Sequence, residues 1–245
     1  MSLTRLITRL IYSERVRTEF TETEDEIEGW VAAAGLDYFS SLDEDFVNRA
    51  IDLGVSSGMV LDVNSRLGLV TMKLLWKKDD LLAIGAYRTK EMADRTRDTA
   101  MEWDLGERMF FQVGEPSRFR FKDGYFDLVI SDGVLNQWAD PVAVLGEIGR
   151  ITKPTGAILI RDFLRPNRLQ IASHIRKHGA QYPESIRDAH ARSVRAGFTP
   201  EEFLELSQAL GVERTRVLAD PTHVVIERRG IDDPASWVVE REKYL

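Results

Sequence analysis

Short apolar segments alternate with amphipathic segments through the middle of the chain, and this alternation most constrains the possible fold. The apolar segments lie at 58–63, 81–87, 108–113, 126–132 and 156–163. Helical patterns lie between them at 67–78, 89–104 and 140–152, with Thr89 as the expected N-cap of the second. Strands that are apolar throughout are typical of a parallel sheet with helices on both faces. The sequence therefore predicts an α/β fold that binds ligands at the carboxyl ends of its strands.

Further elements flank this core. Two helices are expected in 24–39 and 41–54, the second with Ser41 as its N-cap. Residues 164–212 carry three helical patterns and form an insertion where a lid or substrate wall would lie. The last two apolar segments, 213–220 and 222–229, meet at a turn and predict an antiparallel hairpin.

The length of 245 residues suits one domain with a full hydrophobic core. We expect this single domain to be divided into N-terminal helices, a cofactor-binding core, the helical insertion, the hairpin and a tail, at 1–55, 56–163, 164–212, 213–230 and 231–245.

Charge and composition exclude several classes of protein. The net charge of −7 argues against a general nucleic-acid binder, since the phosphate backbone requires a basic surface. The sequence contains no cysteine, which excludes disulfides and thiol catalysis and is compatible with a cytoplasmic location. No apolar run approaches the ~20 residues that cross a bilayer, and no secretory signal is expected.

The first 20 residues have a helical stripe formed by Leu3, Leu6, Ile7, Leu10 and Ile11. One interpretation is a helix that packs on the domain or on a partner subunit, giving a homo-oligomer or a hetero-complex. The other is a helix on a membrane surface. The acidic segment that follows favours the first, because it would oppose an anionic bilayer.

The stretch 114–166, GEPSRFRFKDGYFDLVISDGVLNQWADPVAVLGEIGRITKPTGAILIRDFLRP, carries a specific motif order. Its matching positions are Gly114, Phe121, Phe126 to Val129, Ser131, Leu135, Asp140, Pro141, Glu147, Arg150, Lys153, Pro154 and Gly156. The chain thereby resembles class I S-adenosylmethionine-dependent methyltransferases of the small-molecule type found in quinone biosynthesis. The resemblance spans most of the chain and implies a Rossmann-like, mostly parallel seven-stranded sheet with an antiparallel C-terminal hairpin.

In that family the first strand ends in an acid and a glycine-rich turn that holds the methionine part of the cofactor. Asp62 matches the acid and Gly68 the last glycine, whereas Asn64 and Arg66 replace the other two. Asparagine tolerates positive φ, so Asn64 preserves the turn. The Arg66 side chain either occupies cofactor space, points to solvent or pairs with Asp62.

The resemblance also assigns the adenosine end of the site. Tyr87 stands where the family has the acid that binds the ribose hydroxyls, and a tyrosine cannot replace two carboxylate acceptors. Glu115, after Gly114, takes the place of the acid that binds the adenine amino group. Ser131 completes the cofactor-binding set. These changes fit either a working site with tolerated replacements or a pocket filled by Arg66 and Tyr87.

Methyl transfer needs positioning, and a general base where the acceptor must lose a proton. Asp132, Asn136 and Asp162 follow the fourth and fifth strands and are the candidate catalytic residues. His174 and His178 are four apart on one predicted helix, but no third ligand supports a metal site. His223 lies in the hairpin, where a packing role is expected.

Three hypotheses follow. The first is a methyltransferase that uses S-adenosylmethionine to methylate a small molecule. The second is a catalytically silent pseudo-enzyme that serves as an assembly or regulatory subunit, with the helix in 1–20 as its contact element. The third is a retained pocket that binds another ligand, with Arg66 meeting an anionic group.

Overall fold

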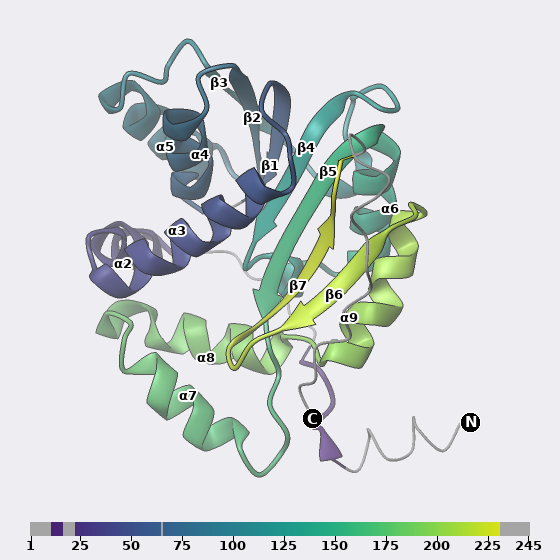
Figure 1. The fold of residues 1–245 in the computed structure, drawn as a ribbon. Coiled ribbons are helices and arrows are strands. Elements are labelled where there is room, and N and C mark those ends of the chain that lie inside the picture. Colours follow the sequence, from purple (N-terminus) through teal and green to yellow (C-terminus); the bar gives the residue numbers. More distant parts are fainter. Residues whose placement is uncertain (1–10, 17–22, 65, 231–245) are drawn as a thin grey trace.

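The computed structural model describes residues 11–16, 23–64 and 66–230, and they form a sheet with helices on both faces (Figure 1). The sheet has seven strands in the order β3-β2-β1-β4-β5-β7-β6. Their bounds are β1 Gly58–Val63, β2 Leu81–Tyr87, β3 Met109–Val113, β4 Phe126–Asp132, β5 Thr152–Phe163, β6 Thr215–Ala219 and β7 His223–Arg228. β1 to β5 pair in parallel, and β7 pairs antiparallel with both β5 and β6. The predicted fold class and C-terminal hairpin are confirmed.

Eight α-helices are described. Their bounds are α2 Glu24–Ala34, α3 Asp37–Asp52, α4 Leu69–Lys77, α5 Lys90–Glu102, α6 Pro141–Ile151, α7 Ile171–Gly179, α8 Arg187–Ala196 and α9 Pro200–Ser207. The Thr89 hydroxyl caps α5 by accepting from the Met92 amide, as predicted. The expected Ser41 cap is wrong. α3 begins at Asp37, directly after Gly35 ends α2, and Ser41 lies inside the helix and donates to the Tyr38 carbonyl.

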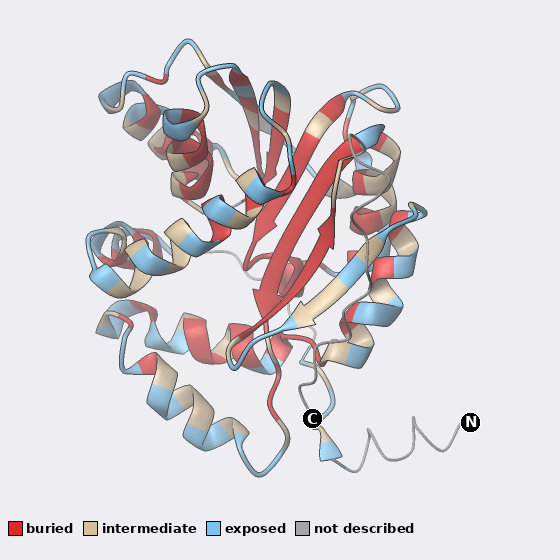
Figure 2. Ribbon diagram, in the orientation of Figure 1, coloured by how far each residue is buried: buried red, intermediate tan, exposed pale blue. Residues whose placement is uncertain are grey.

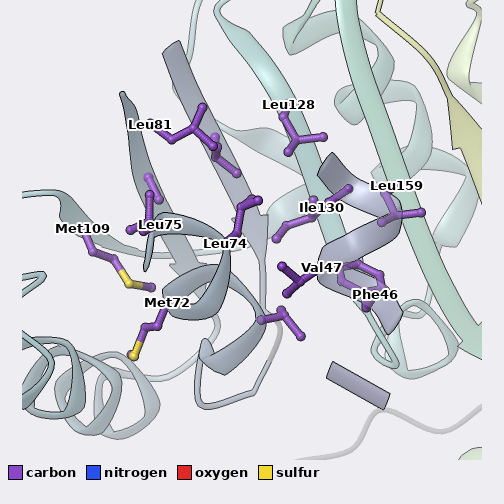
Figure 3. Close-up of a cluster of buried hydrophobic side chains, with 14 of the residues drawn as sticks. Phe46, Val47, Met72, Leu74, Leu75, Leu81, Met109, Leu128, Ile130 and Leu159 are labelled. Atoms are coloured by element: carbon purple, nitrogen blue, oxygen red, sulfur yellow. The ribbon is translucent and has the colours of Figure 1, made fainter. Parts of the chain in front are cut away.

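The two faces of the sheet are covered by different helices. On one face, α3, α4 and α5 pack on the sheet through side chains such as Phe46, Leu74 and Ala100, several of which are drawn in Figure 3. On the other face, α6 and α9 pack through Leu145, Phe203 and their neighbours. The central strands are buried on both sides (Figure 2), which explains their uninterrupted apolar sequences.

The remaining helices gather at the carboxyl end of the strands. Figure 1 shows α2 at this end of the sheet, with α7 and α8 of the insertion near it. α2 contacts the short 3₁₀ turn η3 (Glu184–Ile186), which directly precedes α8. The carboxyl ends of the strands are therefore enclosed by two segments that are far apart in sequence.

The helix predicted in 1–20 falls almost wholly outside the described residues. Within the part of the chain that is described, no helix is long and apolar enough to cross a membrane.

Candidate functional site

The turn after β1 has three residues with positive φ. Asn64 has φ 57°, Arg66 has φ 46° and Gly68 has φ 67°. Asn64 has the positive φ that its conformational tolerance predicts. Gly68 begins α4, and a Cβ at this position would lie 2.7 Å from Thr96 Cγ2 and 2.8 Å from the Tyr87 hydroxyl. Position 68 therefore requires glycine for both its conformation and its close packing.

The Arg66 side chain is half-buried, and among the described residues it makes no ion pair with Asp62, so the predicted pairing with Asp62 is wrong. Its guanidinium carbon lies 4.1 Å from the centroid of the Trp30 ring and 6.0 Å from that of Phe163. A Cβ on Gly133, the residue after β4, would lie 2.8 Å from Arg66 Nη2. The guanidinium thus fills the space between the ends of β1 and β4, under a tryptophan from α2.

Little empty space remains around this arginine. A void of about 50 Å³ is lined by residues that include Trp30, Phe39, Arg66 and Asp132. In the family pattern, this is the side of the turn that holds the methionine part of the cofactor.

The Tyr87 ring lies in the packed interior instead of the cavity. Tyr87 is 0% exposed, clusters with Met92 and Ala93, and stacks near Phe111 at a centroid distance of 6.4 Å. Burial, with the nearby charge of Asp62, raises the pKa of its hydroxyl well above the ordinary value. The prediction that Tyr87 fills the pocket does not hold for the adenosine side, because its ring is turned toward α4 and α5.

A larger cavity of about 450 Å³ lies at the carboxyl ends of β1 to β4. Asn64 after β1, Arg88 after β2, Glu115 after β3 and Gln137 after β4 contribute to it. The other lining residues are Glu24, Ile27, Thr89, Glu91, Met92 and Arg95. Four successive strand ends therefore converge on one cavity, where a parallel sheet binds its ligands.

Three other predicted cofactor residues, Asp62, Gly114 and Ser131, are not among the residues that line this cavity. Asp62 is fully buried and accepts a hydrogen bond from the Thr71 hydroxyl at 2.5 Å. The buried Ser131 donates to the Val63 carbonyl at 3.2 Å, which joins the ends of β4 and β1. Gly114 has open space where a Cβ would lie, so a ligand can approach its backbone closely.

Asp132 is held in an ion pair. Arg161 Nε and Nη2 each donate to its carboxylate at 2.8 Å. Burial alone would raise the pKa of Asp132, but the charge and hydrogen bonds of Arg161, with the charge of Arg66, lower it below its ordinary value. Asp132 is therefore an ionised anchor for arginine and a weak proton acceptor.

Asp162 and Asn136 form a buried pair. Asp162 accepts from the Asn136 amide at 3.0 Å, from the Asn136 side chain at 2.7 Å and from the Phe163 amide at 2.6 Å. Burial raises the pKa of Asp162 to about 6 despite these donors. The pair joins the end of β5 to the turn that follows β4.

The four histidines of the sequence lie around this edge of the sheet. The His174 and His178 rings on α7 are 4.4 Å apart, and His190 on α8 lies 4.2 Å from the Tyr182 ring and 5.8 Å from Phe163. Burial and neighbouring histidines lower the pKa of His174 and of His190 to about 4. Among the described residues, no group of three or more potential ligands could hold a metal ion.

The sequence analysis did not place His223 at this edge. β7 runs antiparallel to β5, and the register pairs His223 with Phe163, the last residue of β5. In an antiparallel pair, the first residue of one strand lies beside the last residue of the other. The predicted antiparallel hairpin therefore already contained the signal that His223 is near the carboxyl ends.

The fold and the cavity at its strand ends define a protein of the class I methyltransferase type. Residues 51–160, a little under half of the chain, match a family model described as a methyltransferase domain. This match and the relatives below support a class I S-adenosylmethionine-dependent methyltransferase.

Known proteins agree with this assignment. The chain is 25% identical over 136 residues to 27-O-demethylrifamycin SV methyltransferase of Amycolatopsis mediterranei, covering 53% of this chain and 50% of the relative. It is 26% identical over 137 residues to demethylmenaquinone methyltransferase of Deinococcus radiodurans, covering 50% and 56%. A solved structure of Haemonchus contortus phosphoethanolamine N-methyltransferase 2 with S-adenosyl-L-methionine superposes with a TM-score of 0.61 at 17% identity, covering 80% of this chain and 43% of that one. The chain spans about half the length of these two curated relatives.

Proposed function

We propose that this protein transfers a methyl group from S-adenosylmethionine to a hydroxyl group of a small molecule. The observation that carries the proposal is the cavity of about 450 Å³ at the ends of β1 to β4. The family match over 51–160 supports the cofactor, and the two curated relatives are named as methyltransferases of small molecules.

The residues present fit the adenosine half of S-adenosylmethionine. Glu115 and Gln137 offer oxygen acceptors for an amino group, and Asn64 accepts from the Arg88 amide at 3.4 Å across the cavity mouth. The methionine half fits when Arg66 leaves the Trp30 ring, because the guanidinium now fills that end.

The cofactor supplies the reactive group, and the protein supplies binding and orientation. When bound, S-adenosylmethionine supplies an electrophilic methyl group on a positively charged sulfur. The chain's own residues bind and orient: Asn64 shapes the turn, Asp162 and Asn136 fix the loop after β4, and Trp30 excludes water from the methionine side.

Binding calorimetry tests this proposal directly. We expect S-adenosylhomocysteine and S-adenosylmethionine to bind the full chain with one site, and the Glu115→Gln variant to bind them more weakly. Glu107→Gln, which changes an exposed carboxylate outside the cavity lining, is the matched control and should bind like the parent. Absence of heat and of thermal stabilisation at saturating ligand would refute the methyltransferase assignment.

One observation favours a second candidate function. Because Arg66 and Trp30 close the methionine end, the fold would also suit a catalytically silent subunit with assembly or regulatory duties. In that case the parent would not bind the cofactor, and the Arg66→Gly variant would gain that binding.

Three further properties are part of the proposal. Absence of cysteine supports a cytoplasmic location, and the N-terminal stripe in 1–20 supports a homo-oligomer or a protein partner. The division into helices, core, insertion, hairpin and tail stays a prediction. Deletion of 1–20 should change the sedimentation profile if the stripe is a subunit contact, and an unchanged profile would remove that idea.

A further inference from the structure

The tight turn between β6 and β7 connects three polar side chains in a row. The Thr222 hydroxyl donates to Asp220 Oδ1 at 2.9 Å, and the Thr222 hydroxyl oxygen lies 2.8 Å from His223 Nδ1. Asp220 Oδ1 also accepts from the Thr222 and His223 amides at 2.7 Å each. The turn therefore holds its carboxylate rigidly beside the hydroxyl.

This row fixes the tautomer of His223. A hydroxyl has one proton, and the ionised Asp220 carboxylate is a stronger acceptor than a neutral imidazole nitrogen. The Thr222 proton therefore points to Asp220, and His223 Nδ1 must carry the hydrogen that points to Thr222. Burial alone would raise the pKa of Asp220, but His223 and the amides of the turn lower it, so the carboxylate stays ionised. His223 Nε2 keeps its lone pair and makes no hydrogen bond within the described residues.

The other histidines do not share this arrangement. His190 Nδ1 is buried and has no hydrogen-bond partner in the described part of the chain, whereas the rings of His174 and His178 contact each other at a tilt of 44°. Burial lowers the pKa of all three, which makes them poor proton acceptors.

Aromatic rings connect His223 to the cofactor side of the site. His223 lies 5.5 Å from the Phe163 ring, Phe163 lies 5.8 Å from His190, and His190 lies 4.2 Å from Tyr182. Tyr182 in turn lies 6.2 Å from Trp30, the ring that Arg66 covers. Arg66 also faces Phe163. Buried rings that are tilted or edge-on to one another therefore connect the methionine end to His223, and apolar surroundings of this kind suit an aromatic acceptor.

We propose that His223 Nε2 is the general base for a phenolic methyl acceptor, with Thr222 and Asp220 as positioning residues. The inference rests on the proposed methyl transfer. The acceptor O–H bond breaks and its proton moves to Nε2, while the freed oxygen electron pair forms the bond to the methyl carbon. The carbon–sulfur bond breaks with its electron pair left on sulfur, which yields a neutral thioether, and the proton on Nε2 is later released to water.

The proton transfer can be tested without turnover by using 4-nitrophenol, whose phenolate absorbs visible light. At a pH where the free probe is mostly neutral, we expect binding to the full chain to increase the phenolate fraction. His223→Gln should return the fraction of the bound probe to that of the free probe. His174→Gln, which changes a histidine of the same edge, should leave the increase intact.

Three outcomes would overturn the inference: no binding of the probe, binding in the neutral form, or an equal increase in His223→Gln. A second measurement covers a variant that folds poorly. Nitrogen-15 NMR of labelled histidine should show the Nδ1–H tautomer for His223 in the parent, and Thr222→Val should remove that preference. A parent spectrum with the Nε2–H tautomer would contradict the proposal.

Calorimetry with S-adenosylhomocysteine on the same variants separates the two proposals. If the parent and His223→Gln bind it equally while the phenol test fails, only the inference about His223 is wrong. If the parent does not bind it, the proposed function fails instead.

Discussion

Arg66 occupies a position where a glycine would be conformationally unstrained. Its φ of 46° lies in the left-handed region, which disfavours residues with a Cβ. The stacking of its guanidinium on Trp30 offsets that strain, since a desolvated cation–π contact contributes up to about 2 kcal/mol. The residue that departs most from the family pattern is therefore held in place by a helix outside the cofactor-binding core.

Replacing this arginine should separate the two ends of the cofactor. We expect Arg66→Gly to bind S-adenosylhomocysteine about tenfold more tightly, because the lost contact is worth roughly 1–2 kcal/mol. Binding of 5′-methylthioadenosine, which lacks the amino-acid end, should be unchanged. Calorimetry with both ligands checks this, and Arg66→Lys, which keeps the charge but not the planar stack, is the matched comparison. A selective loss of S-adenosylhomocysteine binding would show instead that Arg66 holds the carboxylate.

Asp162 should give the stability a measurable pH dependence. Its pKa of about 6 in the folded state lies above the ordinary value of 3.8, so the folded protein retains a proton that the unfolded chain has lost. The stabilisation is complete below about pH 4 and is lost as the pH rises through about 6. Relative to Asp162→Asn, the parent should lose about 3 kcal/mol of unfolding free energy across this range in urea titrations. A difference that is constant with pH would contradict the assignment.

Individual residues of the site were only partly predictable. The positive φ of Asn64 followed from the conformational tolerance of asparagine, which is a local property. The contact of Arg66 with Trp30 could not be predicted from the sequence, because Trp30 lies on a helix whose position is fixed only by tertiary packing. The low pKa of Asp132 likewise depends on Arg161, which the next strand brings beside it.

At the scale of elements, the strands were the most predictable part. Segments 58–63, 81–87 and 126–132 were predicted with the bounds that β1, β2 and β4 have, because burial on both faces demands continuous apolar sequence. Helix starts were less predictable where no side-chain cap marks them. α3 begins after Leu36 without a capping side chain, and the serine that resembled a cap lies within the helix.

Helix α9 begins with a capping box that also serves a buried charge. Thr199 and Glu202 exchange hydrogen bonds with each other's backbone amides, and Glu202 also accepts from Arg165 Nη2 at 2.5 Å. The Arg165 side chain is almost fully buried, and its Nη1 donates to the Gly197 carbonyl. Glu202 therefore stabilises both the start of α9 and the segment that follows β5.

Removing Glu202 should destabilise the protein well beyond an ordinary surface change. We expect Glu202→Ala to lower the unfolding free energy by about 2–3 kcal/mol, because it leaves a buried guanidinium without its carboxylate. The neighbouring Glu201→Ala is the control and should change it by less than about 0.5 kcal/mol. Equal effects of the two substitutions in urea titrations would show that the contact with Arg165 adds nothing.

At the scale of the whole molecule, the site is closed by contact between α2 and the insertion. Gly29 on α2 packs so closely on η3 that a Cβ would overlap Ile186 and the Ser185 hydroxyl. Trp30 follows directly and contacts Tyr182 and Phe39. The N-terminal helices and residues 164–212, which sequence reasoning treated as separate additions, therefore form one enclosure.

A large side chain at position 29 should open this enclosure without unfolding the core. We expect Gly29→Leu to cost about 1–3 kcal/mol through overpacking and to speed tryptic cleavage within the insertion. Gly35→Leu is the matched control, because the nearest atom to a Cβ there is 3.9 Å away. Cleavage rates measured under native conditions should rise only for the first variant. Equal rates would show that α2 does not protect the insertion.

The contact between Arg66 and Trp30 also has a consequence for how strongly the protein responds to ligand concentration. On the proposed function, a molecule in which the arginine covers the ring would not accept the complete cofactor, and only the uncovered fraction would be competent. Apparent affinity falls in proportion to that fraction, and a bias of about 1.4 kcal/mol toward the covered form weakens it tenfold. Occupancy would then follow changes in cofactor supply that a preformed, saturated site would not register.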